Sequence, residues 1–589
     1  MIAGRTDVSA AEIGGARLSE RTIIDDKLVV FLVGGVIGLF LIVFMVVPVF
    51  NILRLSVTRY HEGTHEFVRG LTLANFANYF GKPAIVQSLW NSLYVSLWTT
   101  IITTVLAFLY AYGLTRTTIR RKKALYYAAM IPLVAPSLLQ AMALISMFGV
   151  NGLVTAGLLK VEWNIYGSTG IIISEVLYCL PHAMVILYAT LSAVDTRLDE
   201  AAASLGASGV TTFFRITVPT ARYGIFSAAA LTFNLTITDF GNPIIIGRGY
   251  RVLATEIYLQ VIGMQRFDLG TTIAVVLLVP SVIAFLLNYH FTKKSHALIS
   301  GQAQPMLHES RPLRKWSFSV FCWFMALVMM SVIGVVLAKA FVAVWMYDWT
   351  LSLRHFKFRI PGGIGVLWTS LWISVVVGMM GAFLTLLNGY IIEKKKPFFA
   401  QPLYLLSVIP AAIPGMVMGL GYILIFNTRF LRLDQLLYGK AALIIVNTVV
   451  CNFTLGTLSS ISNMKNIDRS IDEAATSLGA DIVGTFARVI APLSRTTFFS
   501  NVIYYFMRSM VTISAVIFLI SPDVHLAAVS VVNLERDGRQ GSSSAMATLI
   551  VAVVCAVLAL FGLLFRGSSR SRVGLQGTDA LRRARQEQT

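Results

Sequence analysis

Long apolar runs recur along nearly the whole 589-residue chain. A run of about 20 apolar residues can cross roughly 30 Å of hydrocarbon as a helix, and a helix satisfies its own backbone hydrogen bonds there. The chain is therefore predicted to be an all-α integral membrane protein, embedded in a lipid bilayer. Twelve spans are expected, at residues 28–52, 87–114, 124–149, 169–192, 221–246, 269–290, 317–346, 367–392, 400–426, 441–463, 497–520 and 545–566.

Composition and charge exclude several other classes of protein. Hydrophobic residues make up 56% of the chain and charged residues only 13%, far from the mix found in soluble domains. The net charge of +20 does not indicate nucleic-acid binding, because Lys and Arg cluster in the short segments between the runs. The four cysteines lie inside apolar runs without metal-ligand spacing, so no metal site is expected. No catalytic constellation recurs at helical spacing either.

The basic segments also predict the orientation of the chain. Clusters at 120–123, 293–294 and 394–396 fall on one side of a twelve-span path. Because positively charged loops stay in the cytoplasm, both termini are expected to be cytoplasmic. The first run begins at Leu28, is longer than a signal-peptide core and lacks a clear cleavage site, so it is expected to remain as a span.

The chain contains an internal repeat. The sequence "SLYVSLWTTIITTVLAFLYAYGL" from Ser92 aligns with "SLWISVVVGMMGAFLTLLNGYII" from Ser370, 278 positions later. Further along, the stretch that starts at Asp199 aligns with the one at Asp472, 273 positions later. Each half holds an even number of spans, so the two copies have the same orientation. The predicted fold class is two parallel six-span repeats related by a pseudo-two-fold axis.

Domain boundaries follow from the spans and the repeat. Residues 291–316 carry Pro, Ser, Gly and Gln between basic ends, which is typical of a linker. The predicted organisation is a cytoplasmic N-terminal segment (1–27), a first six-span repeat (28–290), a cytoplasmic linker (291–316), a second six-span repeat (317–566) and a basic cytoplasmic tail (567–589).

One polar stretch occurs in both repeats without a gap. It reads "DEAAASLGASGVTTFFRITVP" up to Pro219 and "DEAATSLGADIVGTFARVIAP" up to Pro492. In each copy an Asp is placed to cap a helix, and a Gly can take the left-handed conformation that ends it. A second short helix then runs to the Pro, which suits the first turn of the next span. We call residues 195–219 and 468–492 the first and second brackets. Their cap and end residues are Asp195 and Gly206, and Asp468 and Gly479.

The brackets are predicted to bind another protein. A single stretch of this kind would ordinarily be an amphipathic loop without a partner. Two gap-free copies instead favour two equivalent docking places for a two-fold symmetric partner. Glu200 and Glu473 are expected to project from the first helix of each bracket, and the neighbouring Ala residues would let another surface approach closely.

The bracket pattern resembles a known signature. The cytoplasmic signature of binding-protein-dependent ABC importer permeases reads Glu-Ala-Ala, three residues, Gly, nine residues, Ile, one residue and Leu-Pro. Val218 departs from it in the first copy, and Val489 and Ala491 in the second, but all three remain apolar. The resemblance covers the whole chain and is closest to fused permeases for iron(III), aminoethylphosphonate or sugar phosphates. Residues assigned to ATPase coupling are Asp199, Glu200, Ala201, Ala202, Gly206, Pro219, Asp472, Glu473, Ala474, Ala475, Gly479 and Pro492.

The resemblance implies a type I ABC importer permease in the bacterial inner membrane. An extracytoplasmic binding protein would deliver the solute, and the brackets would insert into grooves of an ATPase dimer. A P-loop needs Gly-Lys-Ser/Thr, yet Gly81-Lys82 is followed by Pro83 and Gly439-Lys440 by Ala441. No cofactor is therefore expected in this chain, because ATP and Mg belong to the partner ATPase.

A proton- or ion-coupled secondary carrier is the alternative. It too would have twelve spans in two parallel halves. Such carriers need intramembrane acids as proton relays, and only Glu175 and Asp239 are convincingly placed. The large facilitator family also requires an acid in the loop after the second span, which here reads "GLTRTTIRRKK". The ABC permease is the preferred interpretation.

Polar residues inside the spans mark a candidate translocation path, since a charge at mid-membrane costs roughly 3 kcal/mol on insertion scales. At the offset of 273, Arg508 corresponds to Leu235, one helical turn from Asp239. The two charges are thus expected at similar depth, either as a structural ion pair or on the path itself, with Arg508 meeting an anionic group. Prolines 132, 136, 410 and 414 are expected to break the third and ninth spans. The candidate path residues are Asp239, Asn242, Arg508, Glu175 and His182.

Overall fold

The computed structural model describes residues 26–61, 66–161, 163–194, 201–202, 204–298, 312–428 and 432–586. The first repeat begins with a long helix, Asp26–Ser56, that ends in η1 (Ile42–Val46) and α2 (Val47–Ser56). Its further elements are β1 (Thr58–His61), β2 (Glu66–Leu71), α3 (Ala74–Phe80), α4 (Pro83–Arg116), α5 (Lys122–Met130), η2 (Ile131–Val134), α6 (Leu138–Phe148), η3 (Leu153–Leu159), α7 (Ser168–Ala193), α9 (Gly209–Thr212), η4 (Phe213–Thr217), α10 (Val218–Thr220), α11 (Arg222–Thr238), α12 (Gly241–Ile246), α13 (Leu253–Tyr258), η5 (Leu259–Gly263) and α14 (Phe267–Leu298).

The second repeat follows the same order. Its elements are α15 (Pro312–Phe341), β3 (Val342–Val344), β4 (Asp348–Leu351), η6 (Arg354–Phe356), α16 (Gly365–Tyr390), η7 (Ile391–Lys395), α17 (Ala400–Val408), η8 (Ile409–Ala412), α18 (Gly415–Phe426), α19 (Asp434–Leu437), α20 (Ala441–Cys451), α21 (Phe453–Asn466), α22 (Arg469–Ser477), α23 (Ile482–Thr485), η10 (Phe486–Ile490), α24 (Ala491–Leu493), α25 (Arg495–Val511), α26 (Ala527–Arg536) and α27 (Gln540–Gln586).

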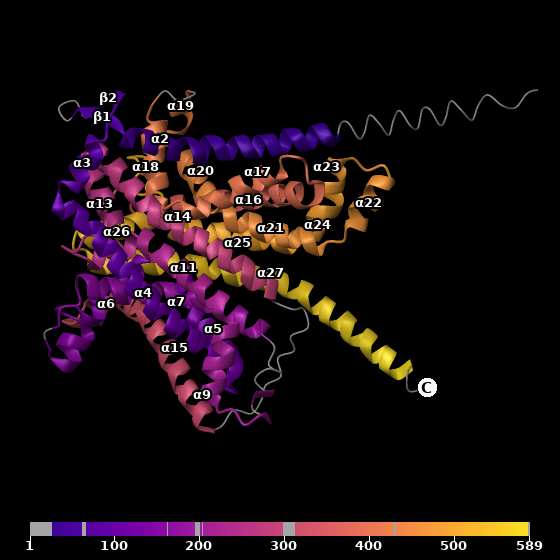
Figure 1. Ribbon diagram of the computed structural model, residues 1–589. Helices are drawn as coiled ribbons and strands as arrows, with labels where there is room; N and C mark the ends of the chain where they lie inside the picture. Colours follow the sequence, from indigo (N-terminus) through magenta and orange to yellow (C-terminus); the bar gives the residue numbers. More distant parts are fainter. Residues whose placement is uncertain are drawn as a thin grey trace, which may run out of the picture.

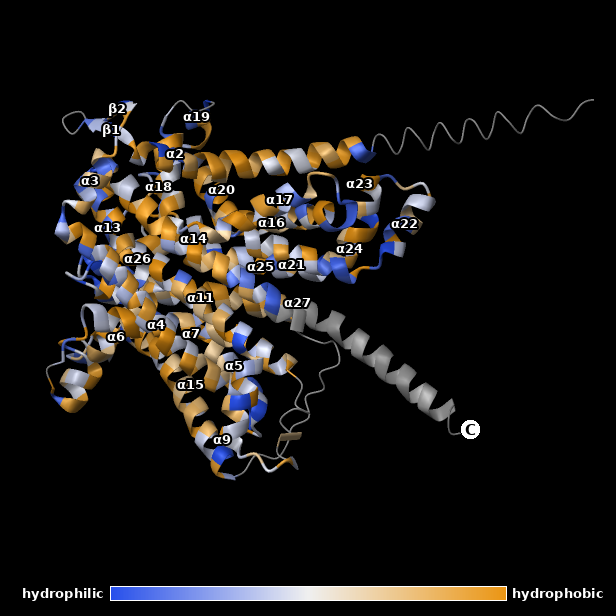
Figure 2. Ribbon diagram, viewed as in Figure 1, coloured by the Kyte–Doolittle hydropathy of each residue, from blue (hydrophilic) through white to orange (hydrophobic). Residues whose placement is uncertain are grey.

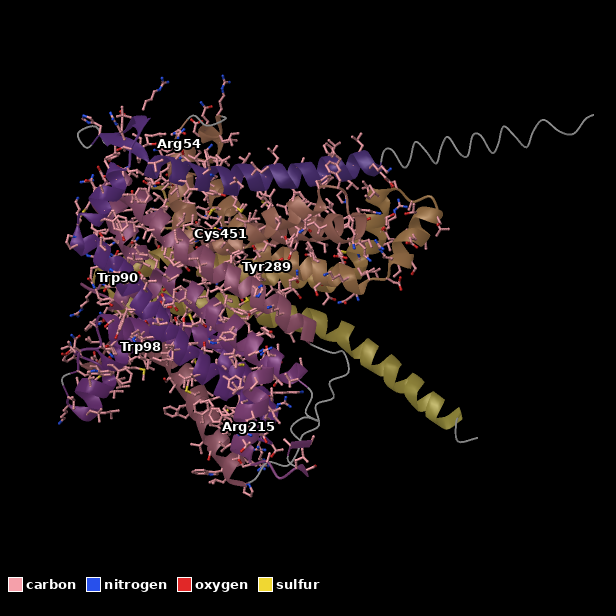
Figure 3. The ribbon with its side chains drawn as sticks, viewed as in Figure 1. Arg54, Trp90, Trp98, Arg215, Tyr289 and Cys451 are labelled. Atoms are coloured by element: carbon pink, nitrogen blue, oxygen red, sulfur yellow. The ribbon has the colours of Figure 1, made fainter. Side chains whose placement is uncertain are left out.

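The helices form two bundles that converge at one end of the molecule. Figure 1 shows them meeting near α13 and α26 and diverging toward α9 and α22, which belong to the two brackets. Hydrophobic residues follow the long helices, and hydrophilic ones gather near α9 and α22 (Figure 2). On α4, Trp90 and Trp98 are 61% and 45% exposed, as suits a surface that faces lipid (Figure 3). We call the α9/α22 end the bracket end.

The described residues hold eight helices that are long and apolar enough to cross a membrane, or ten if two bent pairs each count as one span. Continuous helices were expected at 221–246 and 497–520, and that expectation is wrong. The helices there, α11 and α25, have 17 residues each and stop at extended residues, Asp239 and Thr512. The Asp239 carboxylate accepts a hydrogen bond from the Asn242 N–H at 2.8 Å and so starts the separate helix α12.

The third and ninth expected spans are broken as predicted, at their paired prolines. Each 3₁₀ turn, η2 or η8, ends at an extended residue, Ala135 or Ile413. In the second repeat the flanking helices are bent by 106°. These breaks pack against the breaks after α11 and α25 through reciprocal small residues. A Cβ on Gly241 would lie 2.3 Å from Ser137 Oγ, and one on Gly415 would lie 2.8 Å from Ser514 Oγ.

Each repeat's first helix packs on the other repeat. The helix Asp26–Ser56 lies against α18, where the Tyr422 hydroxyl donates to the Phe44 carbonyl at 2.6 Å. At its start, Asp26 accepts a hydrogen bond from the Ile482 N–H of the second bracket at 2.9 Å. Conversely, α15 lies against α5 and α6 of the first repeat. The two repeats are therefore joined by exchanged helices.

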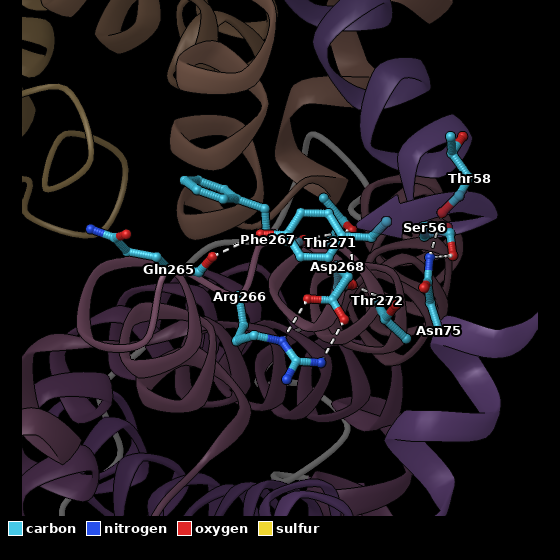
Figure 4. Close-up of polar contacts among 10 residues, drawn as sticks. Ser56, Thr58, Asn75, Gln265, Arg266, Phe267, Asp268, Thr271 and Thr272 are labelled. Carbon is cyan, nitrogen blue, oxygen red and sulfur yellow. Dashed lines mark hydrogen bonds and ion pairs between the residues drawn. The ribbon is translucent and has the colours of Figure 1, made fainter. Parts of the chain in front are cut away.

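Polar contacts fix the segments that connect the spans at the end opposite the brackets. The Asn75 side-chain amide donates to the backbone carbonyls of Ser56 and Thr58 at 3.0 and 2.8 Å, which holds the β1–β2 hairpin against α3 (Figure 4). At the start of α14, Arg266 forms a two-point ion pair with Asp268 at 3.1 and 2.9 Å. These contacts fix the described residues of the hairpin and the start of α14.

We expect Gly381→Leu to destabilise the fold. The buried Tyr505 ring lies 2.7 Å from where a Cβ on Gly381 would be and 2.8 Å from one on Gly456. Overpacking of this kind costs roughly 1–3 kcal/mol, so the melting temperature in detergent should fall by several degrees. The control is Gly35→Leu, where nothing lies within 4 Å. Equal melting temperatures for the two variants would contradict this packing.

Candidate functional site

The second bracket folds as the sequence predicts at its first helix. The Asp468 carboxylate caps α22 by accepting a hydrogen bond from the Ser470 N–H at 2.9 Å, and this bond holds the pKa of Asp468 below its usual value. Gly479 ends the helix with a φ of +79°. A second cap, Asp481, then starts α23 by accepting from the Gly484 N–H at 3.0 Å. The bracket is therefore helix, Gly and helix, as expected.

The described part of the first bracket has the same geometry. Gly206 has a φ of +80°, and the Ala207 N–H donates to the Ala202 carbonyl at 2.9 Å, as the Ala480 N–H does to the Ala475 carbonyl at 3.1 Å. Both bonds are those of a glycine-terminated helix end. Asp195, Asp199 and Glu200 lie outside the described residues.

The prolines occupy a different place from the one expected. Pro219 and Pro492 lie in separate three-residue helices, α10 and α24, that precede α11 and α25. The prediction that each Pro stands in the first turn of the next span is therefore wrong. A turn at Ala221 or Ser494 separates the bracket from that span, so each bracket is a unit joined to its span through a bend.

The adjacent acids Asp472 and Glu473 of the second bracket have different environments. Asp472 forms an ion pair with Lys395 Nζ at 2.9 Å and accepts a hydrogen bond from the Tyr390 hydroxyl at 3.2 Å. It therefore anchors the bracket to the end of α16. Glu473, by contrast, is exposed, as are Ala201 of the first bracket and Ala474 of the second. Glu473 is thus the acid that remains available to a partner.

A hydrophobic residue is exposed at the same position of both brackets. Leu205 and Leu478 are each 88% exposed, and Val210 and Val483 are 68% and 57% exposed. Ala202 and Ala475 are each 8% exposed and pack the brackets onto the protein. Sequence reasoning missed the leucines, although the repeat itself, with "SLGA" in both copies, carries the signal.

A central cavity of about 240 Å³ lies between the repeats. It is lined from both sides by the broken helices and by three of the candidate path residues, His182, Asp239 and Arg508. Cys451, labelled in Figure 3, lines it as well. Asn242 and Glu175 lie behind Asp239 and are fully buried, with the Asn242 amide donating to Glu175 Oε1 at 3.2 Å. The structure thus groups all five candidates.

The interpretation of Asp239 and Arg508 as a structural ion pair is wrong. Among the described residues no ion pair joins them. The Asp239 carboxylate turns toward the Asn242 N–H, whereas Arg508 Nε donates to Asn452 Oδ1 at 3.2 Å. Asp239 and Arg508 therefore lie on opposite walls of one cavity, and each is held by hydrogen bonds to its own neighbours.

Sequence reasoning missed several polar residues of the cavity, among them Asn452 and Asn234. Asn452 holds Arg508, and Asn234 donates to the Ala411 carbonyl at 3.4 Å while its own Oδ1 is buried without a donor in the described part of the chain. An Asn inside an apolar run was the available signal.

An all-α membrane protein with two repeats, duplicated brackets at one end and a polar cavity between the repeats is a transport permease. Residues 105–296 and 385–570 match the family described as "Binding-protein-dependent transport system inner membrane component". The chain belongs to this family and has the fold of a type I ABC importer permease. The secondary carrier proposed as the alternative is therefore excluded.

Similar proteins include two with ferric transport in their names. The chain is 26% identical over 545 residues to the "Ferric transport system permease protein FbpB" of Actinobacillus pleuropneumoniae. The aligned residues cover 90% of this chain and 78% of that protein. The chain is 28% identical over 432 residues to the "Putative ferric transport system permease protein FbpB 1" of Haemophilus influenzae, covering 71% and 68%. The spermidine/putrescine permease PotB of Haemophilus influenzae is 26% identical over 268 residues, 44% of this chain and 92% of that protein.

We expect Asp239→Asn and Arg508→Gln not to compensate for each other. In an ion pair, removing one partner leaves an unpaired buried charge, and removing both restores stability. Here each side chain has its own partners, so the double variant should melt no higher than the less stable single variant. Melting temperature in detergent measures this.

The pair Lys395→Gln and Asp472→Asn is the matched control, because these side chains do form an ion pair. Its double variant should lose less stability than the two single losses added together. Recovery of stability in the Asp239/Arg508 double variant would contradict the geometry described above.

Proposed function

We propose that the chain is the permease of an ATP-driven importer for iron(III), supplied by an extracytoplasmic binding protein. What carries this proposal is the similarity along 90% of the chain to a relative named for ferric transport. The family description implies a binding protein, and the duplicated brackets suit an ATPase dimer. Phosphonate and sugar-phosphate uptake, considered from the sequence, have no counterpart among the relatives described above.

The brackets would be the surfaces that bind the ATPase. Each offers an exposed leucine at the tip, Leu205 or Leu478, with exposed small residues beside it. In the second bracket Glu473 adds an exposed carboxylate, and Glu200 is proposed to do the same in the first. Burying a leucine side chain contributes about 1.5–3 kcal/mol, so each bracket holds both an apolar and an acidic binding group.

The central cavity would lie on the path of the solute. It has a carboxylate, Asp239, and a guanidinium, Arg508, that do not neutralise each other. Such a cavity can contact a cation and an accompanying anion at the same time. The five candidate path residues, Asp239, Asn242, Arg508, Glu175 and His182, remain assigned to this role.

The bracket end is proposed to face the cytoplasm, and with it both termini. The basic residues Arg121, Lys122, Lys394 and Lys396 all lie near this end of the spans that they flank, in agreement with the distribution of positive charge in membrane proteins. The β1–β2 hairpin then lies outside, where a binding protein would dock.

Uptake should require both acidic bracket residues. We expect Glu200→Gln combined with Glu473→Gln to abolish uptake of ferric iron in proteoliposomes that contain the partner ATPase and binding protein, because both docking surfaces lose their charge. The chain should still insert and melt normally. Lys465→Gln, an exposed charged residue on α21 outside the brackets, is the control and should transport like the wild type. Full uptake by the double variant would refute the assignment.

The orientation can be tested by labelling single cysteines in a chain whose four native cysteines are replaced by Ala. Cysteines at positions 122 and 294 should react with an impermeant maleimide only from the cytoplasmic side, and those at 248 and 536 only from outside. One reversed site would overturn that part of the topology. Retained uptake in each labelled background confirms that the fold is intact.

A further inference from the structure

A second cavity, of about 590 Å³, lies at the end opposite the brackets, at the boundary between the repeats. The first repeat contributes the end of α6, Tyr166 and Arg248, and the second contributes the end of α15, η6 and the start of α27. It is distinct from the central cavity, with which it shares no lining residue.

Four cationic side chains line this cavity: Arg248, Lys339, Arg354 and Arg539. None of its lining residues is Asp or Glu, and none of the four cations forms an ion pair within the part of the chain that the structure describes. Asp348 and Glu535 lie near enough to act electrostatically on Arg354 and Lys339, but outside the cavity wall. The cavity therefore has an excess of positive charge.

Several of these cations are held in place by neutral groups. The Arg248 guanidinium lies 3.4 Å from the centre of the Tyr166 ring, Arg354 donates to the Ala343 carbonyl, and Arg539 donates to the Arg359 carbonyl at 2.6 Å. Their positions are thus set by neutral partners, without an ionic counter-charge. A bound anion would meet preorganised donors, which lowers the entropic cost of binding.

Of the four cations, Lys339 gives the clearest indication of an anion site. It is only 5% exposed, and its Nζ donates to Ser146 Oγ and Gln540 Oε1, both at 2.9 Å. These acceptors are neutral, and the third ammonium hydrogen has no acceptor among the described residues. Glu535 acts on this lysine electrostatically but forms no ion pair with it among the described residues. An anion in the cavity would therefore supply the direct ionic partner that this buried ammonium group lacks.

The start of α27 adds further donors. The first N–H groups of a helix have no intrahelical acceptor, and the helix dipole gives this end a partial positive charge. Gly541 lies in this turn, and a Cβ there would be 2.3 Å from the His355 ring. The absence of a side chain therefore lets the His355 ring pack directly against the backbone of Gly541 at the cavity wall.

The position of these charges is also unexpected for a membrane protein. Lys and Arg are concentrated in cytoplasmic loops, whereas this cavity would face outward in the orientation proposed above. The outward orientation is the one step of this inference that rests on the proposed function. We propose that the cavity is a binding site for a phosphate oxyanion, either free phosphate or the phosphate group of a lipid.

The test is calorimetric titration of inorganic phosphate into the full-length chain in phosphatidylcholine nanodiscs at low salt. The wild type should bind with one-site saturation. Lys339→Gln should weaken the affinity at least about tenfold, the loss of one charge-assisted bond. Arg354→Gln should do the same, and it serves as the second variant if Lys339→Gln does not fold.

The matched control is Lys357→Gln, an exposed cation in the segment after η6 that does not line the cavity. It should bind phosphate like the wild type. Absence of saturable binding to the wild type, or equal weakening by Lys357→Gln, would overturn the proposal. Because no ATPase or uptake is involved, failure here is separate from failure of the transport function.

A second titration identifies the source of the oxyanion. In nanodiscs that contain phosphatidylglycerol, unchanged phosphate affinity would assign the site to a free anion. Loss of binding of inorganic phosphate in these nanodiscs would assign the site to a lipid phosphate, because the lipid would then occupy the cavity. Either result supports the assignment of the cavity as a site for a phosphate oxyanion.

Discussion

The structure depends on covering the backbone polar groups that are exposed where its membrane helices are broken. Backbone N–H and C=O groups without partners cost several kcal/mol in hydrocarbon, so non-helical backbone occurs only where protein covers it or where it lines a polar cavity. Here the four breaks, at Ala135, Ile413, Asp239 and Thr512, pack on one another around the central cavity. The repeat supplies the breaks in matching pairs, and that pairing produces a cavity between the halves.

Within this symmetric backbone the side chains have diverged. At the offset of 273, Arg508 corresponds to Leu235 and Asn452, its hydrogen-bond partner, corresponds to Cys179. Thr512 stands where the first repeat has Asp239. The second repeat thus carries the positive charge of the cavity and the first repeat the negative one. The brackets, by contrast, have kept equal exposure of Leu205 and Leu478.

Hydropathy and the repeat could predict the spans, the parallel halves and the brackets, because these depend on periodic patterns and on glycine. Hydropathy alone did not predict that α11 stops at Asp239, because the Ile residues from 244 onward are as apolar as a helix interior. Gly241 and Pro243, which closely follow Asp239, were the available signal. The repeat offset placed Arg508 and Asp239 at similar depth, and both do line one cavity. It could not give the direction of either side chain, which Asn452 and the Asn242 N–H determine.

The exchange of first helices has a mechanical consequence. The helix Asp26–Ser56 belongs to the first repeat but contacts the second bracket through Ile482, and α15 belongs to the second repeat but brings Arg314 to within 3.7 Å of a Cβ position on Gly209 in the first bracket. A force applied to one bracket is therefore transmitted to both repeats. A motor that hydrolysed nucleotide on one side only would still move the two halves together.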